Sequence, residues 1–99
     1  MGKLKQLAEA AADYYQVPLE RLTSTNRMEL YTRPRHQCQW IAADAGIKKS
    51  VIAEFWNLDR SSVHYGCKIV SARIKKSAAE RNELKRFMQY AGKHMAAKR

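Results

Sequence analysis

Apolar residues recur along the chain at the three- and four-residue spacing that is typical of amphipathic helices. Prolines, glycines and short polar stretches fall between these segments, where helices usually end. We expect an all-α fold, a small bundle of about six helices forming one domain over residues 1–99. The pattern predicts helices at about 3–16, 18–22, 34–46, 50–56, 59–74 and 78–96.

The segment from Ser50 to Ile74 predicts two helices joined by a tight turn. Asn57-Leu58-Asp59 forms the turn, because asparagine tolerates left-handed backbone and Asp59 is able to cap the following helix. Both helices therefore have a buried side and a side left for solvent or a partner. The apolar positions are Ile52, Phe55 and Trp56 in the first helix and Val63, Cys67, Val70 and Ile74 in the second.

The outward side of the second helix is basic and rich in hydroxyls. Arg60, His64 and Lys68 follow one another at four-residue spacing, and Ser61 and Ser62 lie in the first turn. A helix-turn-helix places the first residues of its second helix against base edges in the DNA major groove. The spacing fits such a recognition helix and fits a solvated basic helix of a bundle equally well.

Two further stretches place cations at predicted helix starts. Arg33 and Arg35 flank Pro34, where free N–H groups favour an anion, so we expect a phosphate clamp there. Lys48 and Lys49 open the first helix of the turn motif and are candidates for the DNA backbone. The alternative for these lysines is a solvated pair followed by Ser50 as N-cap.

The polar connection from Thr23 to Tyr31 is predicted to lie at the surface, because its backbone groups need water or a partner. It carries Arg27 at its centre. A single arginine in a loop is more often solvated than functional, so the spacing alone does not assign Arg27 a role.

Nineteen Lys and Arg against nine Asp and Glu give a net charge of +10, which indicates a polyanionic partner. Nucleic acid and an anionic membrane surface both qualify, and the basic face of the last helix also fits a membrane-surface helix. We expect that helix to pack on the bundle instead. The chain has neither a run of apolar residues long enough to span a bilayer nor a signal sequence, so we expect a soluble cytoplasmic protein.

Catalytic and metal sites are not expected. Cys38 and Cys67 fall on apolar helix faces outside any C-x-x-C pair, so we predict buried free thiols. His36, His64 and His94 lie on different predicted helices, and no glycine-rich phosphate loop, H-E-x-x-H or G-x-S-x-G sequence is present. We therefore predict a protein that is not an enzyme and needs no cofactor.

Three motifs in register resemble the C-terminal DNA-binding domain of the bacterial replication initiator DnaA. The segment from Ile52 to Tyr65, IAEFWNLDRSSVHY, resembles the pattern I-A/G-x-x-F/L-G-R-D-H-[ST]-T-V-x-H of that helix-turn-helix. Arg33-Pro34-Arg35-His36 is similar to its R-x-R-Q, and Ala11–Val17 to its opening V-A-E-Y-Y/F. The resemblance covers most of the chain and does not extend to the ATPase domain of the family.

The resemblance implies a Trp-repressor-like bundle that binds double-stranded DNA. It implies that Arg27 reaches the minor groove, where narrow A·T-rich segments attract arginine, and that Arg35 holds a phosphate. His36 stands where the family has glutamine, and Arg60 where it has histidine. Because groups that touch DNA have changed, the binding-site sequence of the family is not expected to carry over.

We hypothesise a sequence-specific module for double-stranded DNA that acts in replication control or transcription and associates with the nucleoid. Arg60 is the expected base contact, since arginine pairs with guanine O6 and N7, and Asp59 more often caps such a helix than touches DNA. One alternative is an interaction module that binds a replication protein. A second is a non-specific binder of RNA or of a membrane surface.

Overall fold

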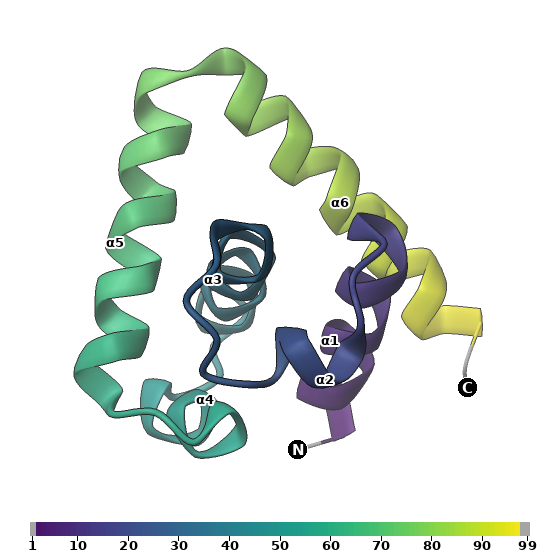
Figure 1. Ribbon diagram of the computed structural model, residues 1–99. Helices are drawn as coiled ribbons and strands as arrows, with labels where there is room; N and C mark the ends of the chain where they lie inside the picture. The colour runs from purple at the N-terminus through teal and green to yellow at the C-terminus, as the bar shows by residue number, and fades with distance from the viewer. Residues whose placement is uncertain (1, 98–99) are drawn as a thin grey trace.

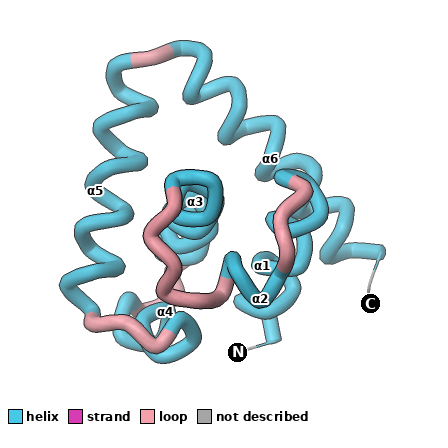
Figure 2. The backbone as a smooth tube through the Cα atoms, in the orientation of Figure 1, coloured by secondary structure: helices cyan, strands magenta, loops and turns pink. Residues whose placement is uncertain are grey.

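The computed structural model describes residues 2–97, and every regular element in that range is a helix (Figures 1 and 2). The all-α bundle predicted from the periodicity is confirmed. No helix in the described range has the length and apolarity needed to cross a membrane. The helices are α1 (Gly2–Tyr15), α2 (Leu19–Leu22), α3 (Glu29–Asp44), α4 (Lys49–Trp56), α5 (Arg60–Lys76) and α6 (Ala78–Ala97).

Helix α3 runs through the middle of the bundle, with α5 on one side and α1 on the other (Figure 1). Trp56 of α4 and Phe87 of α6 are the largest fully buried side chains of the core. The indole N–H of Trp56 donates to the carbonyl of Leu22, so the core also fixes the short helix α2. Apolar burial from all six helices is the main favourable term for a bundle of this size.

Helix α3 begins at Glu29, five residues before the start that Pro34 suggested. Pro34 lies inside the helix, beyond its first turn, where it has no backbone N–H to donate to the preceding turn. The prediction of a helix start at Arg33 to Arg35 is therefore wrong. The surface connection is reduced to residues 23–28.

The turn between α4 and α5 has the predicted backbone. Asn57 adopts φ 54° and ψ 47°, the left-handed conformation that lets α4 stop and the chain reverse. Asp59 occupies the N-cap position of α5, but its side chain makes no capping hydrogen bond, so the predicted cap is wrong. The N-cap of α4 is Lys48, and Ser50 lies within the helix.

Gly66 of α5 lies directly against His36 and Gln39 of α3. A Cβ at this position would lie 2.7 Å from Cδ2 of His36 and 3.0 Å from Oε1 of Gln39. These distances are too short for a normal contact of a Cβ, so a larger residue would require the His36 or Gln39 side chain to move. Trp40 bridges the same two helices, because its indole N–H donates to the hydroxyl of Ser71 at 3.1 Å.

Helix α6 starts as its sequence predicted, with the Ser77 hydroxyl accepting from the Glu80 N–H at 3.3 Å. Tyr14 of α1 stacks on Phe87 and Tyr90 of α6, with ring centroids 5.4 and 5.1 Å apart. Cys38 and Cys67 are buried free thiols, as expected. Burial raises the pKa of both thiols and so disfavours the thiolate form.

Candidate nucleic-acid interface

The first turn of α5 is open to solvent. Arg60, Ser61 and Ser62 are all exposed, while Val63 turns inward and is fully buried. Helix α5 therefore presents its basic and hydroxyl-bearing start outward, as the periodicity predicted. Arg60 makes no ion pair with any described residue, so its five donors are available to an acceptor.

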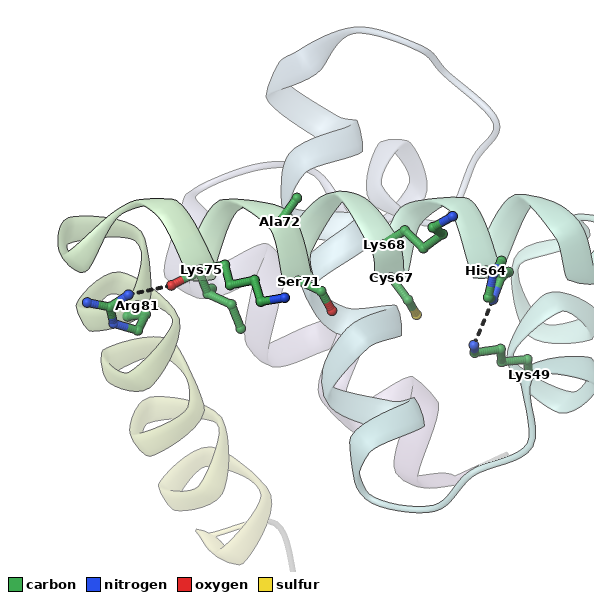
Figure 3. A pocket seen from close by; sticks show the side chains of 9 residues that line it. Lys49, His64, Cys67, Lys68, Ser71, Ala72, Lys75 and Arg81 are labelled. Atoms are coloured by element: carbon green, nitrogen blue, oxygen red, sulfur yellow. Dashed lines mark hydrogen bonds between the residues drawn. The ribbon is translucent and has the colours of Figure 1, made fainter.

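A basic surface lies along one flank of α5, and we call it the lysine flank (Figure 3). It forms a shallow hollow of about 820 Å³, and no carboxylate lines it. The flank is lined by Lys49 from α4, by His64, Cys67, Lys68, Ser71, Ala72, Ile74 and Lys75 from α5, and by Arg81 from α6.

Two contacts hold the ends of the lysine flank in place (Figure 3). The ammonium of Lys49 lies 3.0 Å from Nδ1 of His64 and donates to it, because an ammonium cannot accept. The guanidinium of Arg81 donates to the carbonyl of Ile74 at 2.7 Å and so covers the end of α5. The predicted residues Lys49, His64 and Lys68 therefore lie on one continuous surface.

A second hollow lies along the other flank of α5, and we call it the arginine groove. Its volume is about 580 Å³, and it separates the connection at residues 23–28 from α5. Again no carboxylate lines it. Its residues are Thr25, Arg27, Thr32, Arg35, His36, Gln39, Leu58, Ser61, Ser62, Tyr65, Ile69 and Arg73.

Arg27 is exposed on a connection that is tied down on both sides of it. The Asn26 N–H donates to the Ser24 hydroxyl at 3.1 Å, and the Met28 N–H donates to Oδ1 of Asn26 at 2.9 Å. These local bonds are asparagine and serine turns of the usual kind. They fix the backbone next to Arg27 and leave its side chain free.

Arg35 has a structural role, so its prediction as an exposed phosphate ligand is wrong. The residue is only 4% exposed. Its guanidinium donates to the carbonyls of Leu22 at 2.9 Å, Asn26 at 2.9 Å and Arg21 at 3.1 Å. Burial lowers the pKa of this guanidinium, which still stays charged. Arg35 therefore anchors the connection that carries Arg27.

The prediction for Arg33 is wrong for a different reason. Its guanidinium pairs with the carboxylate of Glu80 and lies 3.5 Å from that of Glu83, both on α6. These partners raise the pKa of Arg33 and join α3 to α6. The phosphate clamp expected at Arg33 and Arg35 does not form, because neither residue lies at a helix start and both have internal partners.

The other predicted residues occupy three different settings. Lys48 and Asp59 are exposed at the starts of α4 and α5. His36 is half-buried in the arginine groove, and burial together with the charges of Arg35 and Arg73 lowers its pKa. His36 is therefore a neutral ring near pH 7 that packs against Gly66.

Tyr65 and Arg73 are groove residues that the sequence interpretation missed. Tyr65 is 64% exposed, which is unusual for an aromatic side chain. A signal for both was present, because positions 61, 65, 69 and 73 follow the four-residue spacing that defines one side of a helix. Lys75 and Arg81 of the lysine flank were missed because they lie beyond the turn motif.

Both surfaces combine cations and hydroxyls with apolar side chains such as Ile74 and Ile69, and the arginine groove adds the exposed ring of Tyr65. Within residues 2–97, no group of His, Cys, Asp and Glu side chains is placed to hold a metal ion. Comparison of the sequence with models of protein families gives no match, and comparison with curated proteins gives none.

Proposed function

We propose that the protein is a binding module for double-stranded DNA that reads base sequence with the first turns of α5. The observation that carries the proposal is the exposed start of α5, with Arg60, Ser61 and Ser62 open to solvent. The lysine flank runs along one side of this helix, and the arginine groove, which the two serines help to line, runs along the other. An α-helix fits the major groove, and the cations on either side of it then face the two backbones that border that groove.

The charge distribution supports this proposal over generic basicity. Neither surface beside α5 contains a carboxylate, although the described chain carries acidic residues elsewhere. Cations without acidic neighbours attract phosphates and release counterions on binding. The resemblance to the DNA-binding domain of DnaA supports the same arrangement, with Arg27 directed to the minor groove.

A role in replication control or transcription, and association with the nucleoid, follow from that resemblance as part of the proposal. Selection of bound sequences from a pool of random duplexes tests it directly. We expect enrichment of one short site, and replacement of the guanine that Arg60 contacts should abolish the enrichment. Equal affinity for all duplexes, for single strands and for anionic vesicles would refute sequence-specific binding.

A further inference from the structure

The arginine groove lies between the connection that carries Arg27 and helix α5. The proposed function places Arg27 in the minor groove of DNA and α5 in the major groove. Arg27 stands on one wall, and Ser61 and Ser62 of α5 stand on the other. A single sugar–phosphate backbone separates the major groove of a duplex from the adjacent minor groove. With α5 in the major groove and Arg27 in the minor groove, that backbone crosses the arginine groove.

We propose that the arginine groove holds the backbone of this one strand and that Arg73 is a phosphate ligand within it. The inference rests on the proposed function. It adds which DNA strand is held, where its backbone runs on the protein, and which residue binds a phosphate. Arg73 lies outside the three motifs that carry the resemblance to the initiator domain, so those motifs assign it no role.

The wall formed by α5 has the length that such a contact requires. Ser61 and Arg73 are the ends of a stripe that also contains Tyr65 and Ile69. Twelve residues of helix extend about 18 Å, and a duplex rises about 3.4 Å per base pair, so the stripe spans about five base pairs. Hydroxyls near its start and a guanidinium at its end are all phosphate ligands.

Arg73 differs from the arginines that the fold uses internally. It makes no ion pair with any described residue, whereas Arg33 pairs with two carboxylates. Arg73 and His36 both line the groove, and the charge of Arg73 contributes to the lowered pKa of His36. The donors of Arg73 therefore remain available inside the groove.

Gln39 gives an independent indication of a ligand. Its side chain lines the groove and is 0% exposed, and neither its Oε1 nor its Nε2 has a hydrogen-bond partner in the described chain. Buried amide groups are nearly always paired. A phosphate oxygen accepts from an amide N–H, and the neighbouring cations favour the same anion.

The test uses the full chain and a duplex carrying the sequence recovered by selection. Binding is measured over a salt series for the wild type, Arg73→Ala, Arg73→Lys and the control Arg86→Ala. Arg86 is exposed on α6 and lines neither surface. We expect Arg73→Ala to weaken binding about tenfold and to reduce the salt slope by about 0.9.

The control should change affinity by no more than about twofold, because it removes the same charge from a remote position. Arg73→Lys should restore the salt slope and part of the affinity, because it keeps the charge and loses the planar pair of donors. Thermal unfolding of each variant confirms that it folds.

Neutral methylphosphonates placed one at a time along each strand identify the phosphate. In the wild type we expect sensitive positions on one strand next to the minor groove, and one of them should lose its effect in Arg73→Ala. If the wild type binds but Arg73→Ala behaves as Arg86→Ala does, the inference is overturned and the proposed function stands. If the wild type binds no duplex, both are overturned.

Discussion

Two groups of arginines in this protein have the same charge and opposite uses. Arg33 and Arg35 are directed inward, the first to carboxylates of α6 and the second to three backbone carbonyls. Arg27, Arg60 and Arg73 make no ion pair with a described residue and lie around the start and one side of α5. The first group stabilises the fold, and the second is available to a ligand.

The difference shows that a net charge of +10 does not locate a binding surface. An arginine contributes to such a surface only where no acceptor of the fold occupies its donors. Whether an arginine is available to a ligand therefore depends on its position relative to the carbonyls and carboxylates of the fold. The comparison can be tested by removing members of each group and measuring stability and DNA binding separately.

The largest expected effect is on stability and comes from Arg35→Ala. We expect the free energy of unfolding to fall by about 3 kcal/mol, because three carbonyls lose their charged donor and a buried volume is emptied. Denaturant titration measures the change. Arg60→Ala, the matched exposed variant, should change stability by less than about 0.5 kcal/mol.

Equal destabilisation by these two variants would contradict the division into internal and external arginines. Arg35→Ala should also weaken DNA binding even where it remains folded, because it releases the connection that carries Arg27. Loss of binding by Arg35→Ala with an undisturbed connection, judged from amide hydrogen exchange of residues 23–28, would restore Arg35 as a direct ligand.

The next effect is on recognition and comes from Arg60→Ala. We expect it to cost about 1–3 kcal/mol of binding to the selected site and to relax the preference at one base pair. Binding to unrelated duplexes should change far less. Equal losses on selected and unrelated duplexes would make Arg60 a phosphate contact and move base reading to other residues of α5.

A smaller effect is expected from the ion pairs of Arg33. Arg33→Ala should lower the free energy of unfolding by about 0.5–1 kcal/mol, since solvent screens these pairs. The side chains of Arg33 and Glu80 are 31% and 22% exposed. Glu80→Gln should produce a similar loss, and the double variant should lose little more than either single one. Additive losses would show that the two residues act independently.

The smallest effect concerns His36 and the pH dependence of stability. Its pKa in the folded protein lies below the ordinary value of 6.5, so unfolding takes up a proton as the pH falls through that value. The contribution of His36 is therefore complete above 6.5 and is lost on acidification. Between about pH 8 and about pH 5, His36→Gln should lose less stability than the wild type.

An equal or steeper loss in His36→Gln would show that His36 does not titrate as a buried neutral ring. Besides burial, the charges that lower the pKa of His36 are those of Arg35 from its own helix and Arg73 from α5. The variant Arg73→Ala provides the control, because removal of that charge should raise the pKa of His36 and reduce the effect.

The sequence by itself determined the helices and the direction of their faces. Apolar spacing decides which side of a helix is buried, and this local rule placed Val63 inside and Arg60, Ser61 and Ser62 outside. Asn57 and the pair Ser77 and Glu80 act through backbone conformation and hydrogen bonds within a few residues. Such features need no knowledge of the rest of the fold.

Only the tertiary structure decided which cations remain free. The partners of Arg33 lie 47 and 50 residues away, and the carbonyls that hold Arg35 lie 9 to 14 residues away, two of them in α2 and one on the connection that follows it. The start of α3 before Pro34 and the closeness of α3 to α5 at Gly66 also depend on packing. The spacing of apolar residues predicts which side of its own helix a residue occupies. It does not predict which carbonyls and carboxylates accept the hydrogen bonds of an arginine, because folding brings these acceptors from other parts of the chain.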